Sequence, residues 1–166
     1  MKKNEKTNVM RVLDQKHVKY ESHLYLEGEI VNGMEIAAVL GEDPARTFKT
    51  LVTVGKSGKN YVFVIPVCRE LDLKKAASAA GEKNIEMLKA KDLLPLTGYV
   101  HGGCSPVGMK KFFPTFFHST AADFPTVYFS AGRIGCQVEL KLDDLKSVIP
   151  FSLADLCTAE SDPAAE

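Results

Sequence analysis

The residues that could do chemistry in this sequence are concentrated in one loop, His101–Lys111. It reads His-Gly-Gly-Cys-Ser-Pro-Val-Gly-Met-Lys-Lys and follows an apolar stretch. Glycine lets the backbone take positive φ and approach a ligand closely, and proline stiffens the segment that follows. Such a loop exposes N–H groups that can cradle a carbonyl, a carboxylate or a phosphate. The composition therefore favours a binding loop over a plain connection between strands, although it does not identify the ligand.

Lys49 is the second candidate, because its ammonium group lies at the start of an otherwise apolar predicted strand. A cation beside buried surface must either reach water or find a polar partner. Lys49 could therefore be a solvent-facing strand lysine, or it could hold a carbonyl group together with the glycine-rich loop. The residues alone leave both interpretations open.

Other polar residues give weaker signals. Cys104 and His101 suggest a cysteine–histidine nucleophile, but neighbours in one loop seldom orient each other and no third orienting residue is evident. We therefore expect the Cys104 thiol to be packed beneath the loop. Ser130 could donate its hydroxyl to a ligand or satisfy its own turn. Three histidines lack any partner spacing and are interpreted as surface or satisfied core residues: His17, His23 and His118.

The elements that must position these residues alternate between helices and short strands. Apolar periodicity and end signals predict helices over 8–17, 35–40, 72–80, 89–94, 142–148 and 152–156. Alternation and turn residues predict strands over 20–26, 48–54, 61–67, 85–88, 126–130 and 136–140. Pro114 limits the aromatic run 112–118 to an edge or irregular strand. This order indicates a single α/β domain with a mixed, largely antiparallel sheet and surrounding helices.

Bulk properties bound the function classes. The chain has 166 residues and zero formal net charge, so no overall field draws it to nucleic acid or membrane, and any RNA contact must be local. We expect residues 1–157 to form one domain and the polar, acidic stretch 158–166 to be a disordered tail. Neither a signal peptide nor an apolar run of membrane-spanning length is evident, which predicts a cytoplasmic protein.

The cysteines give no sign of a metal site. Cys68, Cys104, Cys136 and Cys157 include no pair spaced as zinc ligands, so we expect reduced thiols, several of them buried. The sequence also has no Gly-x-Gly-x-x-Gly or P-loop motif. We therefore expect neither a metal nor a cofactor.

Several stretches together resemble one known family. They are Phe48-Lys49-Thr50-Leu51, Leu71-Asp72-Leu73-Lys74-Lys75, Thr97-Gly98-Tyr99 and the loop Gly102–Gly108. Their order and spacing are similar to those of the YbaK/EbsC family, the cysteinyl-tRNA(Pro) deacylases related to the editing insertion domain of bacterial prolyl-tRNA synthetase. The resemblance runs from the first predicted helix to about Leu156. It implies a single α/β domain around a mixed, partly barrelled sheet.

The resemblance also implies a role for each matching position. Lys49 would be the lysine on which activity depends. The aminoacyl pocket would be lined by Thr50, Gly102, Gly103, Ser105 and Pro106, with Tyr25 and Ser130 at its edge. In this family the cysteine substrate needs no protein nucleophile, because its own thiol attacks the ester carbonyl and releases a cyclic thiolactone and free tRNA. The implied substrate is the acceptor end of tRNA(Pro) carrying cysteine, and the implied partner is prolyl-tRNA synthetase.

Two positions depart from the family's pattern. Gln137 stands where an acidic residue is expected, and Asn32 stands where an aromatic one is expected. Both are expected to border the pocket, so the preferred amino acid stays open between cysteine and another small residue such as alanine on tRNA(Pro). The alternatives from other classes are a non-catalytic regulator that binds aminoacyl-tRNA or the synthetase, and a thiol enzyme that uses Cys104.

Overall fold

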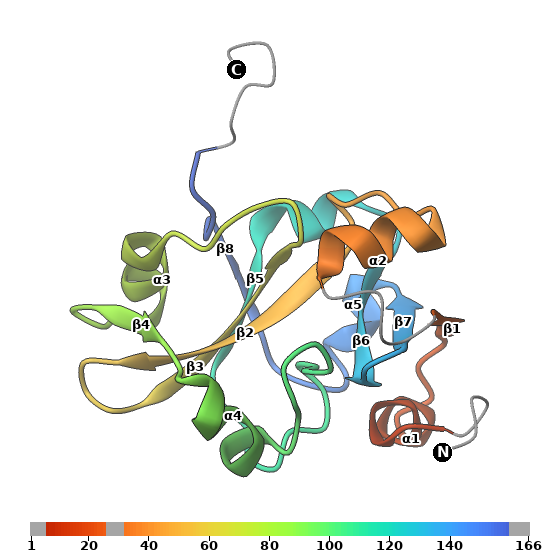
Figure 1. Cartoon of the computed structure of the whole chain (residues 1–166), viewed down its shortest axis with the longest axis horizontal. Helices are drawn as coiled ribbons and strands as arrows, with labels where there is room; N and C mark the ends of the chain where they lie inside the picture. Colours follow the sequence, from red (N-terminus) through yellow and green to blue (C-terminus); the bar gives the residue numbers. More distant parts are fainter. Residues whose placement is uncertain (1–5, 26–31, 160–166) are drawn as a thin grey trace.

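The computed structural model describes residues 6–25 and 32–159, which fold into two β-sheets with helices around them (Figure 1). The helices are α1 (Asn8–Gln15), α2 (Gly33–Leu40), α3 (Leu73–Ala80), α4 (Ala90–Thr97), the 3-10 helix η1 (Ser119–Asp123) and α5 (Leu142–Leu145). The strands are β1 (Glu21–Leu24), β2 (Phe48–Gly55), β3 (Asn60–Pro66), β4 (Ile85–Met87), β5 (Thr115–His118), β6 (Val127–Arg133), β7 (Cys136–Leu140) and β8 (Ser152–Ala154).

The larger sheet has the strand order β4-β2-β3-β5-β8. β2 and β3 form the first predicted hairpin, in which Lys49 lies opposite Ile65, and β4 pairs antiparallel with β2. β5 runs parallel to both of its neighbours, β3 and β8. The sheet is therefore mixed, as expected.

The smaller sheet is antiparallel, with the order β1-β7-β6. β6 and β7 form the second predicted hairpin, with a register shift between Ser130 and Arg133. A parallel bridge between Thr47 and Tyr128 joins the two sheets. Instead of the expected partly closed barrel, the strands of the described residues form two sheets. The two sheets are joined by one bridge, and elsewhere the main core lies between their faces. The described strands therefore do not close into a barrel.

The main hydrophobic core lies between the sheets. It includes Val62 and Phe117 from the larger sheet and Phe129 from the smaller one, and all three are fully buried. A second core cluster packs Phe63 against Ala76 of α3. Because the neighbouring residues Val62 and Phe63 belong to different clusters, both faces of β3 are covered.

Several helix ends follow the local signals in the sequence. Thr7 accepts a hydrogen bond from the Met10 N–H at the start of α1, and the Asp72 side chain caps α3. Both α2 and α3 end at a glycine in the left-handed region, Gly41 with φ 68° and Gly81 with φ 74°. The predicted helices over 8–17, 35–40 and 72–80 are thus confirmed to within two residues.

Three local predictions are wrong, because tertiary pairing or solvent outweighs a local signal. β5 lies inside the larger sheet, since Pro114 precedes the strand and its carbonyl accepts a hydrogen bond from the Val62 N–H. Ser152–Ala154 forms β8 instead of a helix because its backbone pairs with β5. α4 continues through the exposed Pro95, since the carbonyl that loses its N–H partner belongs to Lys91, whose exposed position allows water to replace it.

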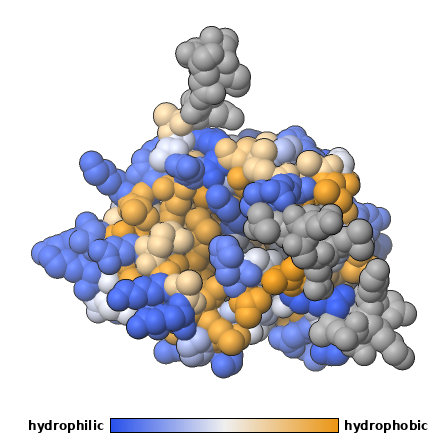
Figure 2. Space-filling view, in the orientation of Figure 1, coloured by the Kyte–Doolittle hydropathy of each residue, from blue (hydrophilic) through white to orange (hydrophobic). Residues whose placement is uncertain are grey.

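The ends and the surface add three observations. No helix among the described residues is long and apolar enough to cross a membrane. On the face shown in Figure 2, apolar residues reach the surface in a broad band between hydrophilic ones. Of the predicted tail 158–166, Thr158 donates its N–H to the Glu70 carbonyl, while residues 160–166 lie outside the described part, as does Leu26 of the predicted strand 20–26.

Candidate active site

A row of polar residues crosses the smaller sheet and continues onto β2. Ser130 on β6 is opposite Gln137 on β7, and Gln137 is opposite His23 on β1. Directly opposed residues point to the same side of an antiparallel pair. One parallel bridge joins the start of β2 to β6. Lys49 and Ser130 each lie two residues after this bridge. Because side chains alternate along a strand, both point to the same side as the two bridged residues. The fold therefore brings Lys49, Ser130, Gln137 and His23 to one side of the joined sheets.

Lys49 and Thr50 lie at the beginning of β2. Lys49 is half-buried, and its ammonium group makes no hydrogen bond or ion pair with another described residue. Strand alternation turns Thr50 to the other face, the side of Phe48 and Val52 in the main core. Its Oγ1 is buried and has no hydrogen-bond partner within residues 6–25 and 32–159. A buried hydroxyl in this condition is costly unless a ligand or water pairs with it.

The glycine-rich loop is fixed against the turn between β6 and β7. A Cβ on Gly103 would lie 3.1 Å from both the Arg133 Cα and the Ile134 nitrogen, so the two backbones are in direct contact. Gly102 has φ 87° and lies beside the Ile134 side chain. A residue with a side chain would be strained at Gly102 and would overlap the turn at Gly103. The loop geometry thus requires glycine at both positions, for different reasons.

The second half of the loop is held from within the core. The phenol of Tyr99 donates a hydrogen bond of 2.5 Å to the Val107 carbonyl, and burial raises its pKa to about 12. Ser105 is fully buried, and its hydroxyl accepts the Val107 N–H. Pro106 lines a pocket of about 250 Å³ whose lining does not include Lys49. The side chains of Ser105 and Pro106 therefore shape the loop and are not brought to the polar row.

Cys104 is buried beneath the loop and belongs to the main core. Burial raises the pKa of its thiol to about 12, so the nucleophilic thiolate does not form at neutral pH. His101 lies exposed on the loop. The expectation of a packed thiol is confirmed, and the structure opposes the alternative of a thiol enzyme. Cys136 and Cys157 are also buried, as expected.

Tyr25 and Ser130, the two predicted edge residues, each form a hydrogen bond to a glycine at or next to the β6–β7 turn. The backbone N–H of Tyr25 donates to the Gly135 carbonyl at 2.9 Å. Ser130 Oγ accepts the Gly132 N–H at 3.1 Å, which is the turn-satisfying role considered for it, and its O–H can still donate to a ligand. Ser130 therefore connects Lys49 with the glycine-rich loop. It lies on the same side of the joined sheets as Lys49, and it supports the turn that contacts the loop.

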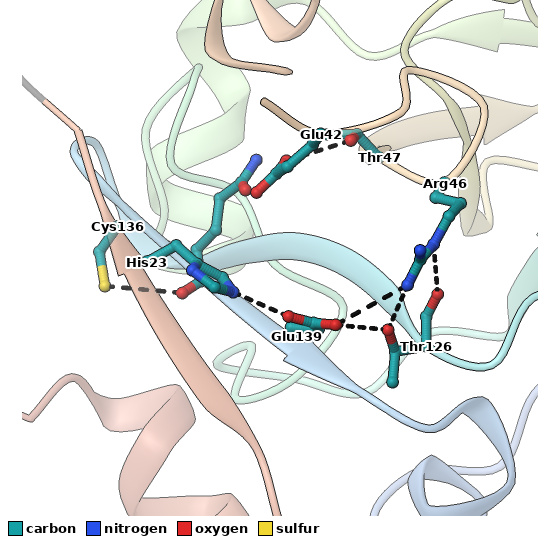
Figure 3. A network of polar contacts seen from close by, with 8 residues as sticks. His23, Glu42, Arg46, Thr47, Thr126, Cys136 and Glu139 are labelled. Carbon is teal, nitrogen blue, oxygen red and sulfur yellow. Dashed lines mark hydrogen bonds and ion pairs between the residues drawn. The ribbon is translucent and has the colours of Figure 1, made fainter. Parts of the chain in front are cut away.

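A network of polar contacts lies on the same side of the smaller sheet (Figure 3). At its centre, Glu139 lies 2.9 Å from His23 Nε2, accepts a hydrogen bond of 2.5 Å from Thr126 Oγ1 and forms an ion pair of 3.7 Å with Arg46. Arg46 also donates to the Thr126 carbonyl at 3.1 Å and lies over the Tyr128 ring. Although burial alone would raise it, the pKa of Glu139 is lowered by these partners, so its carboxyl group stays ionised.

Glu42 lies beside this network (Figure 3), in the segment between α2 and β2. The single O–H of Thr47 is shared between Glu42 Oε1 at 3.1 Å and the Asp43 carbonyl at 3.0 Å. With its amide oriented to donate, Gln137 places its nitrogen 2.9 Å from Oε1 and 2.7 Å from Oε2 of the same carboxyl. Burial raises the pKa of Glu42 to about 6. A carboxyl group perturbed in this way is a candidate functional group.

Sequence reasoning missed Glu42, Arg46 and Glu139. Glu42 lies in a Gly-Glu-Asp-Pro stretch that is typical of a turn, and Arg46 reaches Thr126 across 80 residues. No local spacing could have revealed either arrangement. The two departing positions have clear partners: Gln137 is buried against Glu42, and Asn32 caps α2 by accepting the Glu35 N–H at 2.9 Å.

One group of side chains within the described residues has the types and spacing of metal ligands. The ligand atoms of Glu21, His23 and Glu139 all lie within 4.8 Å of one another. Glu139 already has three protein partners, one of them the cationic Arg46. The geometry therefore favours a hydrogen-bonded network over a cation site.

Comparison with known proteins gives a consistent result. Residues 29–148 match the family model described as "Aminoacyl-tRNA editing domain". A protein of Enterococcus faecalis (strain ATCC 700802 / V583), a candidate Cys-tRNA(Pro)/Cys-tRNA(Cys) deacylase named EbsC, is 43% identical over 160 residues, which cover 96% of this chain and 98% of that protein.

Two crystal structures share the fold. The hypothetical protein APE2540 has a TM-score of 0.82 and 23% identity, covering 90% of this chain and 99% of that one. A candidate trans-editing enzyme for prolyl-tRNA synthetase has a TM-score of 0.78 and 23% identity, covering 93% of this chain and 100% of that one. These two structural similarities show the fold. The family model and the E. faecalis relative show the family. The chain belongs to the aminoacyl-tRNA editing domain family.

Proposed function

We propose that this chain is a trans-editing deacylase that removes cysteine from mischarged tRNA(Pro). The observation that carries the proposal is the 43% identity, over nearly the full length of both chains, to a relative described as a candidate Cys-tRNA(Pro)/Cys-tRNA(Cys) deacylase. The arrangement of Lys49, Ser130 and the glycine-rich loop supports it, because these residues can bind and orient an aminoacyl ester.

The proposed reaction uses the substrate's own thiol. The cysteine sulfur attacks the carbonyl carbon of its ester, a C–S bond forms, and the bond between that carbon and the ribose oxygen breaks. The thiol proton passes, through solvent, to the departing ribose oxygen. The products are a cyclic thiolactone and free tRNA. Such an intramolecular attack depends on orientation, which can supply about 7–11 kcal/mol of the barrier. A buried, protonated Cys104 is consistent with this mechanism, since no protein thiol takes part.

Lys49 is proposed to bind the terminal ribose or the adjoining phosphate of the tRNA. Lys49 is half-buried, and its ammonium group has no hydrogen-bond or ion-pair partner among the described residues, so an oxygen of the substrate can supply one. Backbone N–H groups of Gly102, Cys104 and Ser105 would polarise the ester carbonyl, since Pro106 has no N–H and the Gly103 N–H donates to the Val100 carbonyl. Tyr25, Thr50, Gly102, Gly103, Ser105, Pro106 and Ser130 remain proposed contributors to this pocket. Ser105 and Pro106 would act through the shape of the loop, and Thr50 would act from the core side of β2 without facing Lys49.

Selection of tRNA(Pro) is proposed to depend on prolyl-tRNA synthetase. The chain carries no net charge, so the general attraction of RNA to its surface is weak and phosphate contacts must be local. Lys110 and Lys111 are the last two residues of the loop, and both are exposed, so they can contact phosphates next to the acceptor end. The synthetase, which holds the cognate tRNA, would supply the remaining selectivity. An enzyme with this substrate acts where tRNA is charged, in the cytoplasm.

A deacylation panel tests the proposal. Purified protein is incubated with Cys-, Ser- and Ala-tRNA(Pro), with and without prolyl-tRNA synthetase. The proposal predicts rapid release of cysteine and little release of serine, because a hydroxyl is a far weaker nucleophile than a thiol. Faster release of alanine than of cysteine would instead favour the sibling specificity. Tight binding of Cys-tRNA(Pro) without turnover would favour a non-catalytic regulator.

A further inference from the structure

We propose that Glu42 binds the α-ammonium group of the aminoacyl ester and thereby orients the amino acid for reaction. This inference rests on the proposed function, because it assigns a substrate group to a residue of the same site. It concerns a side chain that neither the sequence motifs nor the comparisons single out.

The position of Glu42 fits this role. Its carboxyl group contacts Thr47, which lies two residues before Lys49 on β2, and Gln137, which lies opposite Ser130. Glu42 therefore lies over the row that runs from Lys49 across the smaller sheet. An aminoacyl ester carries a cation at its α-carbon and an anion at the neighbouring phosphate. Glu42 and Lys49 offer the opposite charges from the same side of the joined sheets.

The partners of Glu42 explain why its carboxylate can accept a cation. Thr47 and Gln137 are both neutral donors, so within the described residues no ion pair neutralises the carboxylate. The nearby charges are already matched to one another, because Glu139 takes the ion pair with Arg46 and the contact with His23. Arg46 and His23 attract the Glu42 carboxylate without forming an ion pair with it. A half-buried carboxylate whose hydrogen-bond donors are all neutral is more favourable when a cation binds it directly. The α-ammonium group of the substrate is such a cation.

Thr47 and Gln137 also limit how the carboxylate can turn. Thr47 binds Oε1, and the Gln137 amide spans both carboxylate oxygens. A carboxylate has about four lone-pair positions, so positions remain for a further donor after these contacts. Two fixed neighbours reduce the entropy that would be lost on binding substrate. Glu42 is therefore preorganised as an acceptor.

The test compares substrates with and without the α-ammonium charge. Cys-tRNA(Pro) and N-acetyl-Cys-tRNA(Pro) are both deacylated at pH 7.5 by the unaltered protein and by Glu42→Gln, and each rate is corrected for hydrolysis in buffer. We expect acetylation to lower kcat/KM of the unaltered protein by about 10- to 100-fold, the range of a charge-assisted hydrogen bond. In Glu42→Gln, kcat/KM for Cys-tRNA(Pro) falls by a similar factor and acetylation has little further effect. Glu42→Asp, which keeps the charge, retains part of the discrimination.

A matched control and the contrary results complete the test. Glu86→Gln makes the same chemical change on an exposed residue of β4 and should leave both rates unchanged. If acetylation lowers the rates of the unaltered protein and of Glu42→Gln by the same factor, Glu42 does not bind the ammonium group and the inference is overturned, while the deacylase function stands. If the unaltered protein does not deacylate Cys-tRNA(Pro) at all, the proposed function fails first. Thermal unfolding of each variant shows whether a lost rate reflects a lost fold.

Discussion

Replacing Gly103 with alanine tests whether the loop acts by its position. The added Cβ would lie 3.1 Å from the Arg133 Cα and the Ile134 nitrogen, and 3.2 Å from the Arg133 carbonyl carbon. All three are backbone atoms, which cannot rotate away as a side chain would. The loop must therefore move off the β6–β7 turn by a few tenths of an ångström.

Two effects of different size follow from this shift. Overpacking of this kind costs about 1–3 kcal/mol, which in a domain of this size lowers Tm by about 2 to 12 °C. A misplacement of about 1 Å can cost about 100-fold in rate, so the smaller shift here is expected to lower kcat for Cys-tRNA(Pro) by about 10-fold. Thermal unfolding and single-turnover deacylation measure the two effects separately.

Gly58→Ala is the matched control for lost stability. Gly58 has φ 89° in the β2–β3 turn, and nothing lies within 4 Å of its added Cβ. Alanine there costs about 1–2 kcal/mol through backbone strain alone, away from the loop. We expect Gly58→Ala to lower Tm and to keep kcat. If Gly103→Ala unfolds and deacylates like the unaltered protein, the close contact between loop and turn does not position the substrate.

Three further variants test the states of Cys104, Glu42 and Glu139. Cys104→Ala should keep its deacylation rate, because burial keeps the thiol protonated; complete loss of activity in a folded variant would restore the thiol enzyme. The pKa of Glu42 in the folded protein, about 6, lies above the ordinary 4.5. Ionisation of Glu42 therefore lowers the free energy of unfolding as pH rises from 4.5 through 6. Urea unfolding should then show Glu42→Gln to be up to about 2 kcal/mol more stable at pH 7.5 and unchanged at pH 4; equal stability at both values would contradict the pKa. The pKa of Glu139 is lowered. Its ionised carboxyl group therefore stabilises the folded protein above pH 4.5, and this stabilisation is lost as pH falls below 4.5. Glu139→Gln should cost about 1–3 kcal/mol at pH 7, and a loss that persists at low pH would point to packing instead.

The sequence predicts the elements whose signals are local. Thr7 and Gly41 mark helix ends because capping depends on neighbouring residues. Both hairpins follow from turn residues between alternating strands. β8 could not be predicted, because its backbone is satisfied by pairing with β5, far along the chain. The edge strand predicted from Pro114 is wrong for the same reason. A proline disrupts a strand only where its missing N–H is needed for pairing, and the pairing of β5 begins after Pro114.

The candidate site is predictable only in part. The loop could be predicted because glycine and proline encode its unusual backbone, and Gly102 and Gly103 do have the expected roles of positive φ and close approach. Lys49 attracts attention as a charge at the start of an apolar strand. Glu42 has no such signal, because its importance comes from burial against Gln137, which only the fold creates.

The role of Lys49 is tested by the rate of Cys-tRNA(Pro) deacylation by Lys49→Ala beside that of the unaltered protein, with Tm recorded for both. The Lys49 ammonium group makes no hydrogen bond or ion pair with another described residue, and alanine keeps the backbone pairing with Ile65, so the variant should fold normally. We expect Tm to be unchanged and cysteine release to fall to the rate of hydrolysis in buffer. Cysteine release by Lys49→Ala at the rate of the unaltered protein would rule out the proposed role of Lys49.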